Sequence, residues 1–142
     1  MSSKIEEMVS VLRKWQGIER ESMNVTAEIM EKTDNVYLRM IMEVIRHDSL
    51  MHHRVQQFLI DSVTVKDVTL TREEVGEVWS AIEEHDKAEQ ETIKLAEELM
   101  NKAWSPLHKH LLAYLLTDER KHDALLEQLG EVKSGMTKAS GA

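Results

Sequence analysis

The chain has 142 residues, of which 42 % are hydrophobic, so it is long and apolar enough to bury a core as one domain. Its formal net charge of −8 argues against a nucleic-acid partner, and the absence of Cys excludes disulfides and thiolate-held metals. The single Pro, the five Gly and the many Glu, Leu, Lys and Met favour an all-α fold. Because no signal-like or membrane-spanning apolar run is present, we expect a cytoplasmic protein without a membrane partner.

The first half of the chain carries the period of two helices. Apolar residues recur about every 3.6 positions over about residues 4–32 and again over about 36–60, which predicts a helix for each range. Between them, the segment KTDN supplies turn and N-cap residues. Residues of about 61–71 are rich in β-branched side chains and lack a helical period, so we expect an extended linker there.

The second half of the chain repeats this organisation. Thr71, followed three residues later by Glu74, is typical of a capping box, and the apolar period predicts a helix over about 72–102. A Ser-Pro pair then marks the start of a fourth helix over about 106–129. The remaining residues, 130–142, are expected to form a flexible tail.

The lengths of the connections predict how the four helices are arranged. Two short connections make each consecutive pair an antiparallel hairpin, whereas the eleven residues of about 61–71 reach about 36 Å when extended. A helix of about 24 residues is also about 36 Å long, so this linker can run the length of a bundle. We therefore expect one domain, residues 1–142, in which one long crossover joins two antiparallel hairpins in a four-helix bundle.

A shift of 70 residues superposes the apolar positions of the two halves, which indicates an internal pseudo-twofold repeat. Polar residues on the apolar stripes coincide under the same shift: Glu19 with Glu89, Asp48 with Asp118, and His52 with His122. In each expected hairpin the Glu and the Asp are equidistant from the turn, so the two lie at one height. Four carboxylates and two imidazoles are thereby expected to converge in a layer across the middle of the bundle.

Such a layer is a candidate metal site. Four buried carboxylates cannot all stay ionised without compensation, because burial and like-charge repulsion both oppose ionisation. Two divalent transition-metal ions would neutralise the layer, and carboxylate and imidazole ligands suit iron, manganese or zinc. The alternative is a metal-free layer of hydrogen-bonded polar groups in a structural or interaction protein.

The pattern resembles the ferritin-like superfamily, in particular the rubrerythrin-type and di-iron carboxylate four-helix bundles. In that superfamily two helices each give a Glu ligand, and two others each give a Glu-x-x-His pair. The matching positions are Glu19 and Glu89 for the single Glu ligands, and His52 and His122 for the His ligands. The segment DERKH contains a literal Glu119-x-x-His122, whereas the segment DSLMH has Ser49 where the Glu would stand.

The resemblance implies a dinuclear metal site, with iron favoured over manganese or zinc, in an oxidase, a peroxidase or an iron-handling protein. Asp48 and Asp118 would replace the Glu ligands, four residues rather than three from their His. His85, one turn before Glu89, is either a seventh ligand or a donor that orients a ligand carboxylate, and Glu119 is an additional candidate ligand. Without Cys for a rubredoxin-type iron centre, a redox role would need an external electron donor, and we expect a dimer. Whether the chain is an enzyme, and which residues would be catalytic, stays open.

Overall fold

Four long helices make up nearly all of the chain. The computed structural model describes the backbone of residues 3–141 and the side chains of residues 3–134. The helices are α1 (Ser3–Lys32), α2 (Val36–Thr64), α3 (Arg72–Lys102) and α4 (Pro106–Gly141), and the described residues contain no strand. The all-α prediction is confirmed. No helix in the described part of the chain is both long and apolar enough to cross a membrane.

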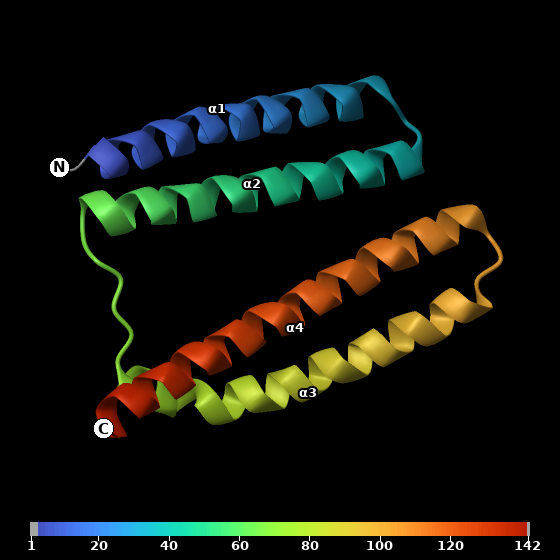
Figure 1. The fold of residues 1–142 in the computed structure, drawn as a ribbon. Helices are drawn as coiled ribbons and strands as arrows, with labels where there is room; N and C mark the ends of the chain where they lie inside the picture. Colours follow the sequence, from blue (N-terminus) through green and yellow to red (C-terminus); the bar gives the residue numbers. More distant parts are fainter. Residues whose placement is uncertain (1–2, 142) are drawn as a thin grey trace. The chain divides into compact units, whose positions relative to one another are not determined.

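The chain divides into two units, Met1–Thr69 and Leu70–Ala142, each with one pair of helices. We call them hairpin 1 (α1 and α2) and hairpin 2 (α3 and α4); Figure 1 shows the short loop that joins the two helices within each. In hairpin 1, Gln16 Nε2 donates to Gln57 Oε1 at 3.0 Å, and Ser49 Oγ donates to Ser22 Oγ at 2.9 Å. Later residues of α1 therefore pair with earlier residues of α2.

Local side-chain chemistry starts three of the helices where the sequence predicts. Asn35 Oδ1 accepts from the backbone N–H of Tyr37 and of Leu38, at 3.0 Å each, and so caps α2. Thr71 Oγ1 accepts from the backbone N–H of Glu74 at 3.2 Å and caps α3. Ser105, before Pro106, accepts from a backbone N–H in the first turn of α4. Each cap satisfies donors that the helix itself leaves unpaired.

The buried residues of α1 follow a narrow seam against α2. They are Leu12, Gln16, Glu19 and Thr26. The apolar residues beside this seam are 37 % to 60 % exposed and are not covered by α2: Met8, Val11, Trp15, Ile18, Val25 and Ile29. The sequence suggests one inward stripe on α1, but the structure has two: a buried stripe that packs on α2 and an exposed apolar stripe beside it. This is because two packed helices bury only a narrow row of residues, repeating about every 3.5 positions. Glu19 lies in the seam, while Trp15 and Val25 lie outside it.

Helix α2 is longer than predicted, and the linker is correspondingly shorter. It continues past residue 60 to Thr64, where the hydroxyl of Thr64 donates to the carbonyl of Ile60 at 2.8 Å. Ile60 is 1 % exposed, so its packing holds a segment in the helix that propensity alone assigns to an extended chain. Residues 65–71 remain as the linker and reach about 23 Å, about half the length of α2. The expected crossover of 61–71, long enough to run along a whole helix, is thus corrected.

Helix α4 also continues beyond its predicted end near residue 129. The backbone is helical through Gly141, where the sequence suggests a flexible tail from residue 130. Contacts within hairpin 2 continue in this stretch: a Cβ on Gly130 would lie 3.5 Å from the ring of Trp79, and Lys133 Nζ lies 4.7 Å from that ring's centroid. The cation over the indole face and the close approach at Gly130 extend the packing of α4 on α3 past Leu129.

Candidate metal centre

Each hairpin contains three of the six predicted site residues: Glu19, Asp48 and His52 in hairpin 1, and Glu89, Asp118 and His122 in hairpin 2. Glu19 of α1 and Glu89 of α3 are buried, each 7 % exposed. Asp48 and Asp118 are half-buried, and the two imidazoles are exposed. Burial therefore singles out the two Glu residues as the carboxylates held most firmly away from water.

Hairpin 2 brings together three candidate ligands: Glu89 from α3, with Glu119 and His122 from α4. One ligand atom of each lies within 4.8 Å of the others. His122 Nδ1 is 3.7 Å from Glu89 Oε1 and 4.0 Å from Glu119 Oε2. The Glu119-x-x-His122 spacing makes this possible, because residues three apart share one face of a helix. Among the described residues, these three form the only such group of His and carboxylates.

Asp118, the acid of α4 that the repeat selects, lies outside this group. Its Oδ1 is 3.2 Å from Lys121 Nζ, in an ion pair along the surface of α4. Asp118 and Glu119 are equally half-buried, but only Glu119, three residues after the buried Leu116, offers an atom to the group with Glu89. Glu119, considered above as an additional ligand, is thus the acid of α4 that meets Glu89.

The carboxyl groups of Glu89 and Glu119 contact each other directly. A hydrogen bond from the Glu119 carboxyl lowers the pKa of Glu89, and His122 and His85 lower it further against the opposing effect of burial. The same hydrogen bond and burial raise the pKa of Glu119. The opposite directions mean that Glu119 takes up a proton more readily than Glu89 does. The buried Oε2 of Glu89 has no hydrogen-bond partner.

This contact limits what can occupy the site. Two ionised carboxylates in contact repel each other, and a proton or a cation between them would relieve this repulsion. The His122 ring is also beside them and can give a nitrogen lone pair to a metal when neutral. A divalent ion bound here would compete with protons for the two carboxyl groups and would leave both ionised.

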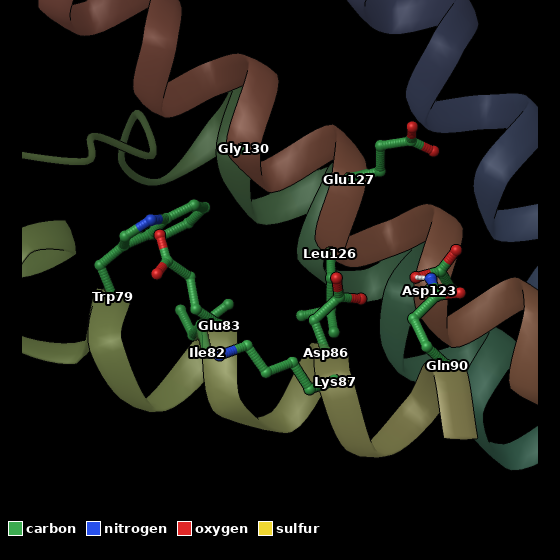
Figure 2. Close-up of a pocket in the computed structure, with 10 residues that line it drawn as sticks. All are labelled: Trp79, Ile82, Glu83, Asp86, Lys87, Gln90, Asp123, Leu126, Glu127 and Gly130. Carbon is green, nitrogen blue, oxygen red and sulfur yellow. Dashed lines mark hydrogen bonds between the residues drawn. The ribbon is translucent and has the colours of Figure 1, made fainter. Parts of the chain in front are cut away.

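A second carboxyl contact lies one helical turn away in hairpin 2, between Asp86 of α3 and Asp123 of α4. The hydrogen bond with Asp123 and partial burial raise the pKa of Asp86. Gln90 Nε2 donates to Asp123 Oδ1 at 2.6 Å, and Figure 2 shows this bond joining the two helices. The 70-residue repeat does not select these acids, although Asp86 precedes Glu89 by three residues and Asp123 follows Glu119 by four, spacings that keep side chains on one face of a helix.

A cleft of about 460 Å³ opens beside Asp86 and Asp123. Figure 2 shows the ring of Trp79 at one end of this cleft and Gln90 at the other. Carboxylates of Glu83 and Glu127 also line it. Solvent therefore reaches the seam of hairpin 2 one turn from the three candidate ligands.

Hairpin 1 has a different set of groups at the equivalent positions. His52 Nδ1 is 3.0 Å from Glu19 Oε2, which matches the pairing of His122 with Glu89. Ser49 stands at the position of Glu119; it is buried, and its hydroxyl donates to Ser22. Hairpin 1 therefore contributes a carboxylate and an imidazole, and neutral hydroxyls fill the place of the second carboxylate.

Comparison with known proteins finds no significant match for the chain: no family model, no curated protein and no solved structure. The function proposed below therefore rests on the residues and contacts of the two hairpins. The contact between Glu89 and Glu119 beside His122 is the most specific of these.

Proposed function

We propose that the chain binds a divalent transition-metal ion in hairpin 2, with Glu89, Glu119 and His122 as ligands. The grouping of Glu89, Glu119 and His122 carries the proposal: one ligand atom of each lies within 4.8 Å of the others, and the buried Oε2 of Glu89 has no hydrogen-bond partner. A metal ion would neutralise the two carboxylates and give that oxygen a partner. Binding would then release a proton and be stronger at neutral than at acidic pH.

Iron is the metal that we favour, with manganese and zinc as alternatives. Two carboxylates and one imidazole are a hard, oxygen-rich ligand set that suits these ions. Three protein ligands also leave coordination positions open for water or for an oxidant. The Glu119-x-x-His122 motif and the 70-residue repeat support a ferritin-like protein in which iron would supply oxidase, peroxidase or iron-handling chemistry.

The number of ions per chain follows from the difference between the hairpins. Hairpin 1 offers Glu19 and His52, with Ser49 where hairpin 2 has its second Glu. A second ion, which a dinuclear protein requires, would therefore bind to hairpin 1 with fewer ligands and lower affinity. We expect one tight site and one weak site for each chain.

Anaerobic titration of the metal-free protein with ferrous iron tests the proposal. About one equivalent is expected to bind tightly, and Glu89→Gln is expected to remove that binding because the amide cannot act as a charged ligand. Asp118→Asn is the matched control: it should leave the tight site unchanged, since Asp118 pairs with Lys121. Less than about 0.2 equivalents of bound iron after reconstitution would refute the metal site.

A structural role is the second candidate, and hairpin 1 supplies the observation that favours it. Gln16 donates to Gln57 and to the backbone carbonyl of His53, and Ser49 donates to Ser22, so neutral groups satisfy much of this polar seam. Such a seam can specify helix pairing without metal. In that case, thermal unfolding of the wild type would not respond to added metal, whereas Glu89→Gln would stabilise the chain by removing a buried charge.

A further inference from the structure

His85 is the nearer of the two imidazoles that contact the buried carboxylate of Glu89 in hairpin 2. It lies four residues before Glu89 on α3, and its Nε2 is 2.8 Å from Glu89 Oε1. His122 Nδ1 approaches the same oxygen from α4, at 3.7 Å. Only the His85 distance is within hydrogen-bond range, so His85 holds Oε1 of Glu89, while the other oxygen, Oε2, is buried and has no hydrogen-bond partner.

The position of His85 differs from that of a ligand. His85 is not part of the group in which Glu89, Glu119 and His122 offer atoms within 4.8 Å of one another. Its side chain is 62 % exposed, and the Nε2 that could bind an ion is already against Oε1 of Glu89. Groups that hydrogen-bond to a metal-binding carboxylate orient it and tune its affinity without touching the metal.

The repeat provides an independent comparison. The position of His85 corresponds to Trp15 in hairpin 1, a residue that is 51 % exposed. Glu19 there has His52 as its ion-pair partner, and an indole at Trp15 cannot act as an ionic partner to a carboxylate. The extra imidazole, His85, is therefore present in hairpin 2, which has three candidate ligands. In hairpin 1, which has two, Trp15 stands in its place.

We propose that His85 is a positioning residue: it holds Oε1 of Glu89 so that Oε2 is oriented for a metal ion bound with Glu119 and His122. This inference rests on the proposed function of the site. It assigns His85 an effect on metal affinity and no place in the coordination sphere. Loss of the contact would let the Glu89 carboxylate rotate and would weaken binding, while the set of ligands stays the same.

Co²⁺ titration of the full chain, followed by visible absorption, tests this assignment. His85→Ala is expected to weaken Co²⁺ binding by about 10- to 100-fold, the range seen for groups that support a metal ligand. His85→Gln keeps a donor within reach of Glu89 and is expected to restore most of the affinity. At saturation the absorption spectrum of both variants should match the wild type, because no ligand has been lost.

The matched control is His47→Ala, which removes an exposed imidazole 3.8 Å from the carboxylate of Glu43 in the same i,i+4 arrangement. It should leave Co²⁺ affinity unchanged. Wild-type affinity in His85→Ala would overturn the positioning role while the proposed metal site stands, and a changed spectrum would overturn it by making His85 a ligand. A wild-type chain that binds no Co²⁺ would remove both the proposed function and this inference.

Discussion

The two hairpins are related by the 70-residue repeat, but they differ in how the polar groups between their two helices are satisfied. Three repeat-related positions show this difference: Gln16, Ser49 and Gln57 in hairpin 1 correspond to Asp86, Glu119 and Glu127 in hairpin 2. In hairpin 1 neutral donors and acceptors pair across the helices. In hairpin 2 carboxyl groups contact carboxyl groups, and these contacts raise the pKa of Asp86 and of Glu119.

This difference shows how one scaffold can carry both a structural seam and a candidate binding site. Amides and hydroxyls contain their own donors, so Gln16 pairs with Gln57 and Ser49 with Ser22 in hairpin 1, although the buried Oε1 of Gln56 has no hydrogen-bond partner. Ionised carboxylates are acceptors only, so a proton or a cation from solution would relieve the carboxyl contacts of hairpin 2. Because Ser49 in hairpin 1 corresponds to Glu119 in hairpin 2, hairpin 1 has two candidate ligands and hairpin 2 has three.

The largest expected effect is on stability and concerns an apolar difference between the hairpins. Ile60 is 1 % exposed, and its repeat equivalent in hairpin 2 is Gly130. Ile60→Ala should lower the free energy of unfolding by about 2–5 kcal/mol, because the lost methyl groups leave a cavity. Gly130→Ala should instead raise it by about 0.5–1 kcal/mol, since Ala is the better helix former and its Cβ would make ordinary contact with Trp79. Chemical denaturation of both variants measures these changes, and equal effects would contradict the packing difference.

The second expected effect is on metal affinity and makes hairpin 2 resemble hairpin 1. Glu119→Ser should weaken Co²⁺ or Fe²⁺ binding by more than about 100-fold, because losing a ligand costs more than losing a supporting group. That loss corresponds to about 2.8 kcal/mol. Isothermal titration calorimetry on the metal-free protein measures it. Unchanged affinity would show that the ligands lie elsewhere.

The third expected effect makes hairpin 1 resemble hairpin 2. Ser49→Glu creates a second Glu-x-x-His sequence, ending at His52, and should raise the number of tightly bound ions from about one to about two per chain. Because Ser49 is 5 % exposed, the new carboxyl should cost about 1–3 kcal/mol of stability without metal. Metal should restore this stability by binding to the folded chain. Elemental analysis and thermal unfolding with and without metal test both parts; a stoichiometry that stays at one would contradict them.

The smallest expected effect concerns pH and the second carboxyl contact. Asp86 has a raised pKa, so the folded chain favours its protonated form and loses stability as the pH rises from the unfolded value of 3.8 through the folded value. Asp86→Asn should therefore stabilise the chain at pH 7, by about 0.5 kcal/mol given the solvent contact of this pair. Below the unfolded pKa the advantage should vanish, since Asp86 is then protonated in both states. If Asp86→Asn raised the free energy of unfolding equally at acidic and at neutral pH, the protonation of Asp86 would not be the cause.

Much of the fold could be predicted from the sequence because its signals are local. Asn35 and Thr71 cap helices through groups two or three residues away, and these contacts depend on little else. The ends of α2 and α4 were predicted too early. Their last turns are held by packing, at Ile60 in one and against Trp79 in the other, and no local pattern shows this.

The sequence by itself determined the all-α fold, the starts of the helices and the repeat that singles out Glu89 and His122. Only the tertiary structure decided which acid of α4 stands against Glu89. Asp118 and Glu119 are adjacent, and one residue along a helix turns the side chain by about 100°, so only one of them can point at α3. That choice depends on the seam at which the two helices pack, and the seam is a property of the pair.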